Sequence, residues 1–311
     1  MYKTDTVLFV FTISSGTVFL YIGDFFMKYL NGSKTTYIET KKVDYKGLRD
    51  VPVIKFIPFK NIEWITHGFS TRLGGVSTGI YSSMNLNFVV GDEKQKVIDN
   101  HIIMAKSLGV EAENCVFSKQ VHKTDILKVK KEHCGMGVVR EREFDEIDGL
   151  ITNEKGIMLV TSYADCVPLY FVDAKNKAIG LSHSGWRGTY DNIAKETLKR
   201  MKEEYHTESK DVITFIGPSI CKNCYEVSKD LAEQFDEKYK GFNVSLYNQN
   251  QNKYFLDLHM ANKANLLREN VPEENIHTTD ICTCCNSELL FSHRASRGKR
   301  GGLCGYLMIS N

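Results

Sequence analysis

Short apolar runs along the central part of the chain predict β-strands. These runs lie at Val53–Ile57, Gly68–Thr71, Ile157–Ser162, Leu169–Val172, Ala178–Ser182 and Val212–Ile216. The polar segment Asp173-Ala174-Lys175-Asn176 separates two of the runs and is typical of a hairpin turn. A hairpin centred on this turn places Cys166 directly opposite His183 on the same face of two antiparallel strands.

Longer segments with apolar residues every three or four positions predict helices. They cover Lys94–Leu108, Asn192–Tyr205, Ser228–Tyr239 and His259–Glu269. Strands and helices are mixed without regular βαβ units and without an internal repeat. We therefore expect an α+β (mixed α/β) fold, in which layered mixed β-sheets are flanked by helices in a single domain.

The first 50 residues differ from the rest of the chain. Val7–Gly23 is a run of 17 uncharged residues, close to the lower limit of about 17 for a membrane helix. Ser14-Ser15-Gly16 interrupts the run, which favours two strands around a turn over a spanning helix. A signal peptide is the alternative, but no small-x-small cleavage site follows. Residues 31–50 are polar and are expected to be a linker, so we divide the chain into an extension (1–50) and a main domain (51–311).

Composition narrows the class of protein. With 42% hydrophobic and 25% charged residues, the chain is globular, which excludes disordered, collagen-like and coiled-coil proteins. The 40 Lys and Arg residues nearly balance 38 Asp and Glu residues. We therefore expect neither a nucleic acid nor a membrane as a binding partner. An odd number of cysteines, nine, argues against a secreted disulfide framework and favours cytoplasmic thiols with a metal-binding or catalytic use.

Four segments carry the candidate chemistry. THGFSTRLGGVS over residues 66–77 is a strand followed by a glycine-rich turn, where Arg72 can pair with an anion. No Gly-Lys-Ser/Thr follows, so this is not a Walker loop. The segments KQVH (119–122), YADCVPL (163–169) and LSHSGWRG (181–188) each place a histidine or cysteine near the end of a strand. Site residues often occupy such positions.

Two chemistries fit these residues. In one, Cys166 is a nucleophile and His183 is its base. In the other, Cys166, His183 and His122 bind a zinc ion that keeps its fourth position open. The spacing does not distinguish them, because the three residues do not form a local CxxC or HExxH pattern.

Most of the other cysteines form two groups. Cys221 and Cys224 form a CxxC pair, and Cys282, Cys284 and Cys285 follow far downstream. Two CxxC pairs at ribbon-like spacing would predict a second, structural zinc site. We interpret the downstream group as CxCC, and we therefore expect buried thiols.

The motifs HGFSTRLGGVS, KQVH, ADCVPLYF, HSGWRG and IGPSIC occur in this order, followed by CYEV at residues 224–227. Together they resemble the YfiH/YlmD family over about residues 52–309. Members have been described as multicopper polyphenol oxidases or laccase-domain proteins, and as zinc-dependent purine nucleoside phosphorylases. The resemblance implies zinc held by His122, Cys166 and His183. It also implies phosphorolysis of adenosine, inosine, guanosine and S-methyl-5'-thioadenosine, with adenosine deamination as a second activity; some members are linked to peptidoglycan editing.

The expected site follows from the resemblance and the motifs. We expect catalytic roles for Cys166, His183, Asp165 and Arg72, and contacts to nucleoside or phosphate from Ser70, Arg72, Arg187 and Arg300. Asp165 either moves protons or orients its neighbouring ligand.

One departure from the family pattern lies near the C-terminus. Where the family usually reads Thr-Gly-Arg-Met, this chain has Arg300-Gly301-Gly302-Leu303, which puts Gly302 at the family's arginine position. If that arginine binds phosphate, Arg300 or Arg297 must replace it.

Two other activities are the alternatives to a zinc-dependent phosphorylase. A copper oxidase is the first, but the nine histidines are scattered and form no HxH pair, which argues against it. A metal-free Cys–His hydrolase is the second.

Overall fold

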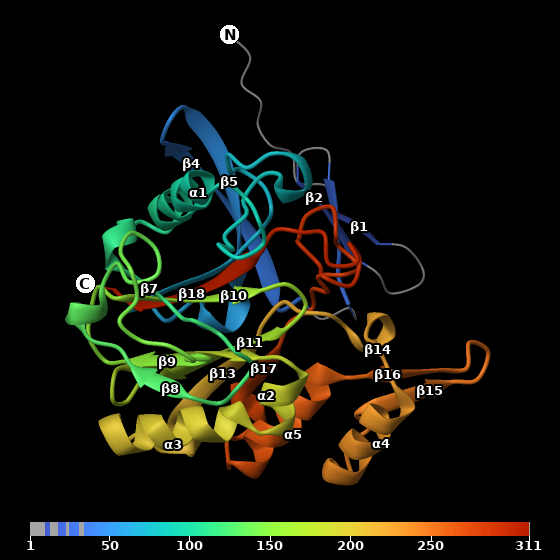
Figure 1. Cartoon of the computed structure of the whole chain (residues 1–311). Coiled ribbons are helices and arrows are strands. Elements are labelled where there is room, and N and C mark those ends of the chain that lie inside the picture. The colour runs from blue at the N-terminus through green and yellow to red at the C-terminus, as the bar shows by residue number, and fades with distance from the viewer. Residues whose placement is uncertain (1–9, 13–17, 23–24, 31–33, 311) are drawn as a thin grey trace.

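The computed structural model describes residues 10–12, 18–22, 25–30 and 34–310, and its main body consists of four layers (Figure 1). Two six-stranded sheets pack face to face in the middle. Helix α1 covers the outer face of the first sheet, and helices α2, α3 and α5 cover the outer face of the second. The expected class of layered mixed sheets flanked by helices is therefore confirmed.

The first sheet is antiparallel except where β10 pairs with β7. In spatial order it contains β4 (Thr36–Asp44), β5 (Leu48–Phe56), β6 (Ile65–Ser70), β18 (Leu303–Ile309), β10 (Met158–Tyr163) and β7 (Cys115–Phe117). The prediction of a linker over residues 31–50 is wrong where the chain forms β4, because this strand pairs with β5 along nine residues. Strand β4 lies at the edge of the sheet and is largely exposed, which explains its polar composition.

The second sheet carries most of the candidate chemistry. In spatial order it contains β17 (Ile276–Thr278), β13 (Val212–Ile216), β11 (Val167–Asp173), β12 (Ala178–Ser184), β9 (Gly149–Thr152) and β8 (Ile126–Lys128). Only β13 with β17 and β8 with β9 are parallel pairs. Beside it lies a small antiparallel sheet of β14 (Glu226–Val227), β16 (Lys253–Leu256) and β15 (Ser245–Asn248).

The N-terminal segment forms a three-stranded sheet of its own. It contains β1 (Val10–Thr12), β2 (Val18–Ile22) and β3 (Phe25–Lys28), and β1 pairs antiparallel with β2. The predicted turn at Ser14-Ser15-Gly16 lies outside the described residues. In the described parts of the chain, no helix has the length and apolarity needed to cross a membrane. The division of the chain at residue 50 stays a prediction.

The described residues form five α-helices, three of which have a side-chain cap at the N-terminus. They are α1 (Lys94–Ser107), α2 (Trp186–Tyr190), α3 (Ile193–Tyr205), α4 (Lys229–Lys238) and α5 (Leu258–Arg268). The side chains of Asn192, Ser228 and Asp257 accept hydrogen bonds from the first turns of α3, α4 and α5. Four of the five helices match the predicted segments to within two residues; the short helix α2 was not expected.

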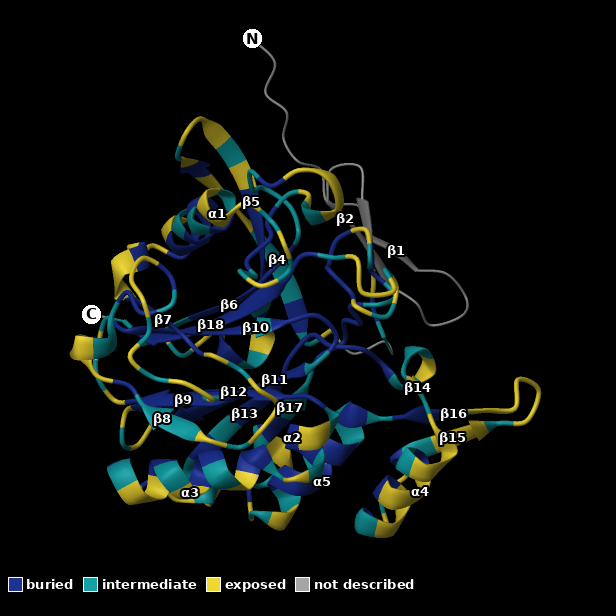
Figure 2. Ribbon diagram, in the orientation of Figure 1, coloured by how far each residue is buried: buried dark blue, intermediate teal, exposed yellow. Residues whose placement is uncertain are grey.

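Aromatic packing joins the two main sheets, whose strands are largely buried (Figure 2). Phe56 of β5 stacks on Phe215 of β13 with ring centroids 4.1 Å apart. Tyr170 of β11 is fully buried, and its hydroxyl donates to the carbonyl of Gly68 in β6 across 3.0 Å. The second sheet is therefore fixed against the first by both apolar contact and a buried hydrogen bond.

The hairpin between β11 and β12 corrects the predicted register. Pro168, rather than Cys166, lies opposite His183. The turn begins after Asp173, because its carboxylate accepts from the backbone N–H groups of Lys175 and Asn176. This shifts the pairing by two positions, so Cys166 is a diagonal neighbour of His183 and the two still share one face of the sheet.

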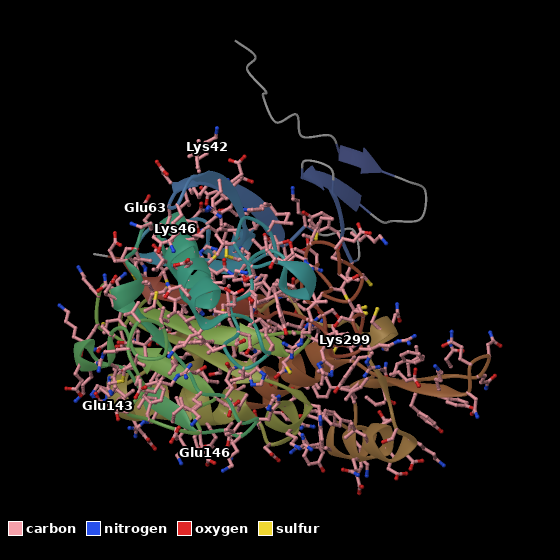
Figure 3. The ribbon with its side chains drawn as sticks, turned by 45° about the horizontal axis from the view of Figure 1, so that its top comes forward. Lys42, Lys46, Glu63, Glu143, Glu146 and Lys299 are labelled. Carbon is pink, nitrogen blue, oxygen red and sulfur yellow. The ribbon has the colours of Figure 1, made fainter. Side chains whose placement is uncertain are left out.

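Charges of both signs are spread over the surface (Figure 3). The labelled examples are Lys42, Lys46, Glu63, Glu143, Glu146 and Lys299. Surface ion pairs such as Lys128 with Glu204 are weakened by solvent and contribute little to stability. Stability therefore depends mainly on the buried layers rather than on these pairs.

Candidate active site

His122, Cys166 and His183 converge at one end of the second sheet. Each offers a nitrogen or sulfur atom, and these atoms lie within 4.8 Å of one another. His122 belongs to the loop after β7 and has a left-handed backbone conformation with φ of 65°. Cys166 immediately precedes β11, and His183 lies in β12. The structure therefore brings together the three residues expected to hold a metal.

Asp148 is a fourth member of the site, which the sequence analysis missed. It directly precedes β9 and is fully buried. Its carboxylate lies 2.9 Å from Nδ1 of His183 and accepts the backbone N–H of His122 across 3.0 Å. Because a carboxylate only accepts, the proton lies on Nδ1 of His183, and Nε2 is left for another partner. One acidic residue before a strand gives no distinctive sequence signal.

The site has a strong internal electrostatic coupling. Burial alone would raise the pKa of the Cys166 thiol, but the charge of His183 and hydrogen bonds from both histidines outweigh burial and lower that pKa to about 6. Burial alone would lower the pKa of His183, but the charge of Cys166 and the hydrogen bond to Asp148 raise it to about 9. Cys166 and His183 therefore each stabilise the charged form of the other.

The chemistry of these donors fits a metal ion. One thiolate and two imidazoles are ligands that zinc prefers, and three protein ligands leave a fourth position for water or substrate. The side of the trio formed by exposed His122 and half-buried Cys166 lines a cavity, whereas His183 is 3% exposed behind them. A bound ion would thus face the cavity.

Gly185 makes room for the trio at the start of α2. A Cβ atom at this position would lie 3.0 Å from Cδ2 of His122 and 3.2 Å from Sγ of Cys166. Both distances are shorter than ordinary van der Waals contacts between such atoms. The glycine in the HSGWRG motif therefore has a steric role.

The cavity beside the trio has a volume of about 420 Å³, within the usual range for small-molecule sites. Its lining combines apolar, aromatic and basic side chains: His122, Ala164, Asp165, Cys166, Trp186, Arg187, Ile220, Tyr225, Leu258, His293, Arg294 and Arg300. A hollow of about 470 Å³ lies elsewhere, with five lysines and two glutamates among its sixteen lining residues, but neither convergent group of metal donors borders it. The smaller cavity is therefore the candidate active site.

Three arginines give the cavity a positive character. Arg187 and Arg300 were expected from the sequence to contact nucleoside or phosphate, and Arg294 lines the cavity with them. The Nε atom of Arg300 is buried and has no hydrogen-bond partner among the described residues. This guanidinium is therefore available to an anion in the cavity.

Gly302 cannot be replaced by the family's arginine without rearrangement. A Cβ atom there would lie 2.5 Å from Cβ of Asn87. The backbone N–H of Gly302 also donates to the side chain of Asn85. Arg300, two residues earlier, lines the cavity instead, whereas exposed Arg297 does not.

Asp165 borders the cavity, but its carboxylate is already engaged. One oxygen accepts from Oγ1 of Thr283 across 2.6 Å, and the other accepts from the backbone N–H of Arg294 across 2.7 Å. Its backbone is left-handed, with φ of 87°. These contacts favour the positioning role among the two roles expected for Asp165.

Ser70 and Arg72 lie outside this cavity. Ser70 is fully buried, and its hydroxyl accepts from the backbone N–H of Cys304. Arg72 donates to the carbonyls of Ser82 and Ser287 and stacks on the ring of Phe291. It lines a neighbouring hollow of about 290 Å³, which Arg300 also borders. Because neither residue lines the main cavity, the structure gives no support to the expected contacts of Ser70 and Arg72 with substrate.

A second group of convergent metal donors was not expected. Cys221, Cys224, Cys282 and Cys285 offer sulfur atoms that all lie within 4.8 Å of one another. The interpretation of Cys282, Cys284 and Cys285 as CxCC hid a second CxxC pair, formed by Cys282 and Cys285.

The sequence of this chain matches one protein family and several named relatives. Residues 66–310 match the family described as multi-copper polyphenol oxidoreductase laccase. The chain is 34% identical over 245 residues to a purine nucleoside phosphorylase YlmD from Geobacillus stearothermophilus, covering 77% of this chain and 88% of that relative. It is 32% identical over 238 residues to an adenosine deaminase RL5 from an unknown prokaryotic organism, covering 76% and 90% of the two chains.

Solved structures share the fold. The crystal structure of YlmD from Geobacillus stearothermophilus matches with a TM-score of 0.79 and 30% identity, covering 90% of this chain and 100% of that one. The hypothetical protein YfiH from Bacillus licheniformis matches with a TM-score of 0.76 and 28% identity, covering 84% and 96%.

Gly185→Ala tests the geometry of the trio. The added methyl group should push His122 and Cys166 apart, so we expect the protein to bind metal about 10-fold or more weakly, as for other changes that misorient ligands. Gly188→Ala, in the same short helix, is the matched control, because its Cβ would meet only ordinary contacts of 3.4 Å and beyond. Metal affinity is measured by competition with a chelator. Equal affinities in the wild type and both variants would contradict this account.

Proposed function

This chain belongs to the family described as multi-copper polyphenol oxidoreductase laccase, and we propose that it is a zinc-dependent purine nucleoside phosphorylase with adenosine deaminase activity. The observation that carries the proposal is the trio of His122, Cys166 and His183, two of which line a cavity that three arginines also line. Relatives named purine nucleoside phosphorylase and adenosine deaminase support an enzyme that acts on nucleosides.

The cavity walls suit a purine nucleoside. Trp186 and Tyr225 offer aromatic surface, and Ile220 and Leu258 offer apolar surface, against which a planar base can pack. Adenosine, inosine, guanosine and S-methyl-5'-thioadenosine share this planar base and differ in the groups at its edge and on the ribose. We propose that the base lies between these side chains with its reacting atoms toward the trio.

The arginines supply the site for phosphate. Arg300 is held at the cavity wall, with one guanidinium nitrogen bonded to the carbonyl of Gly301 and its Nε unpaired. Arg187 and Arg294 approach the same cavity from other segments of the chain. Phosphorolysis needs an anionic nucleophile near the anomeric carbon, and guanidinium groups can hold phosphate there by charge-assisted hydrogen bonds.

The residues around the trio prepare it to bind an ion. Zinc bound by the trio would supply Lewis-acid polarisation of an oxygen atom, a chemistry that serves both phosphorolysis and deamination. Asp148 holds the proton on Nδ1 of His183, so Nε2 is directed as a ligand. Asp165 keeps Thr283 and the backbone of Arg294 in place, which positions the cavity wall beside Cys166.

Zinc fits this donor set better than a multicopper centre does. Trinuclear and blue-copper centres require several clustered histidines. Among the described residues, the two groups of convergent donors contain two histidines in all. We therefore propose zinc, with copper as the alternative that metal analysis distinguishes.

The proposed function predicts base release that depends on both phosphate and metal. Wild-type protein purified without chelator should contain zinc and release purine base from nucleosides only when phosphate is present. Cys166→Ser should lose the zinc of this site together with the activity, because the thiolate is a ligand. If Cys166 is a nucleophile and not a ligand, Cys166→Ser would instead leave the metal content unchanged and lose activity alone. That outcome, or base release that is independent of phosphate, would contradict the proposal; mass spectrometry for metals and chromatography of the products measure both.

Arg300→Ala tests the phosphate site. Loss of a hydrogen bond to a charged group costs about 1.5–3 kcal/mol, so KM for phosphate should rise roughly 10- to 100-fold while zinc content stays constant. Arg297→Gln is the matched control, because exposed Arg297 does not line the cavity. Arg72→Ala provides the comparison with the sequence-based expectation. A larger rise in KM for Arg72→Ala than for Arg300→Ala would move the phosphate site to the neighbouring hollow.

A further inference from the structure

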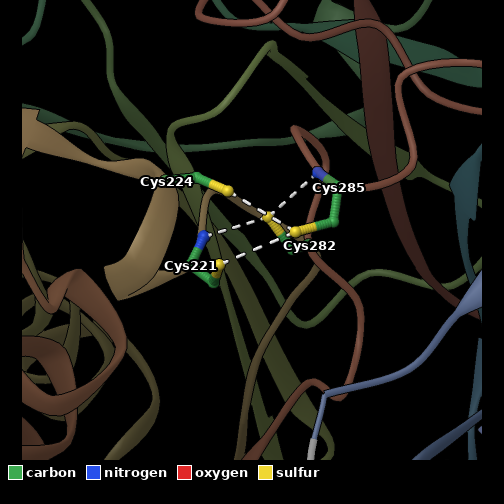
Figure 4. A group of neighbouring side chains, drawn as sticks. All are labelled: Cys221, Cys224, Cys282 and Cys285. Atoms are coloured by element: carbon green, nitrogen blue, oxygen red, sulfur yellow. Dashed lines mark hydrogen bonds between the residues drawn. The ribbon is translucent and has the colours of Figure 1, made fainter. Parts of the chain in front are cut away.

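Four cysteines outside the trio form a compact cluster (Figure 4). The Sγ atom of Cys285 lies 3.4 Å from that of Cys224 and 4.0 Å from that of Cys221. With Cys282, all four sulfur atoms lie within 4.8 Å of one another. These separations are well above the length of about 2.05 Å of a disulfide bond, and all four cysteines are free.

We propose that Cys221, Cys224, Cys282 and Cys285 bind a second zinc ion in a closed, structural site. Zinc–sulfur bonds of about 2.3 Å in a regular tetrahedron place neighbouring sulfurs about 3.8 Å apart. The separations of 3.4 and 4.0 Å lie on either side of this value. Four protein sulfurs leave no open position, which distinguishes this site from the trio beside the cavity.

The fold explains why the two pairs meet. Strands β13 and β17 are parallel neighbours, so their carboxyl ends lie at the same edge of the sheet. The first CxxC pair follows β13 and the second follows β17, and a bridge between Ser219 and Cys282 continues the pairing beyond the strands. Each CxxC pair thus reaches the same point from an adjacent strand.

Backbone groups prepare the sulfurs for a cation. The N–H of Cys221 donates to Sγ of Cys282 across 3.2 Å, and the N–H of Cys285 donates to the same sulfur across 3.4 Å. Such donors stabilise a thiolate, the form that binds metal. Cys282 itself is fully buried, so a thiolate there requires a positive partner.

The cluster holds the wall of the cavity and the N-terminal segment together. Thr283, between two of the ligands, donates to Asp165, which directly precedes Cys166. The side chain of Asn286 both accepts from and donates to the backbone of Lys28. A metal ion in the cluster would therefore fix the loop that joins these two contacts.

The decisive experiment measures the metal and its ligands in variants of the full chain purified under reducing conditions without chelator. Cys166→Ser, which removes a ligand of the trio, should retain one zinc ion per chain. X-ray absorption on this variant should show four sulfur ligands at about 2.3 Å. Wild-type protein should hold two zinc ions per chain; that count rests on the proposed function, whereas the four-sulfur result does not.

Matched substitutions locate the second ion. Cys282→Ser should lower the zinc content by one ion per chain relative to the wild type. Cys284 lies between the ligands Cys282 and Cys285 in the sequence, and Cys284→Ser should leave the zinc content unchanged. If Cys282→Ser does not fold, the absorption spectrum of Cys166→Ser still decides the question. Zinc-free Cys166→Ser, a metal bound through nitrogen in that variant, or a disulfide among the four cysteines would overturn the inference. The two proposals can also fail separately. If the wild-type protein holds a single zinc ion, and Cys166→Ser retains that ion with four sulfur ligands, the result would support the inference and contradict the proposed function.

Discussion

The buried carboxylate of Asp148 is the contact on which the candidate active site depends. It accepts the backbone N–H groups of Val121, His122 and Lys123 and lies 2.9 Å from Nδ1 of His183. Burial alone would raise the pKa of Asp148, but the hydrogen bond and charge of His183, together with the backbone N–H groups of Val121 and Lys123, outweigh burial and lower it. A buried charge is tolerated only when it has such partners. One side chain therefore fixes both the loop that carries His122 and the ring of His183.

The cavity and the cysteine cluster share one wall. Asp165 joins them, because it precedes Cys166 in the chain and accepts from Thr283 and from the backbone of Arg294. The segment that contains Arg294 and Arg300 is thus tied to both sites, although it lies far from Cys166 in the sequence. This arrangement explains how the chain places an arginine at the cavity without using position 302, where Asn87 leaves no room for a side chain.

Local patterns in the sequence predicted the strands around the trio and four helices, because apolar periodicity determines those elements. The pairing register was wrong by two residues, since the Asp173 side chain shifts the turn and apolar patterns contain no such detail. Asp148 gave no signal, because its role arises only from its contacts. The cysteine cluster was missed because the downstream cysteines were interpreted as CxCC, and because strand β17, which brings Cys282 and Cys285 beside Cys221, was not predicted.

The central claim is that His122, Cys166 and His183 hold a zinc ion beside the nucleoside cavity. Anomalous diffraction from crystals of the full chain, with data collected on both sides of the zinc absorption edge, tests it most directly. The account predicts a zinc peak within bonding distance, about 2.0–2.3 Å, of Sγ of Cys166 and Nε2 of His183. No anomalous peak between these atoms, or a peak that stays equally strong below the zinc edge, as copper would give, would contradict it.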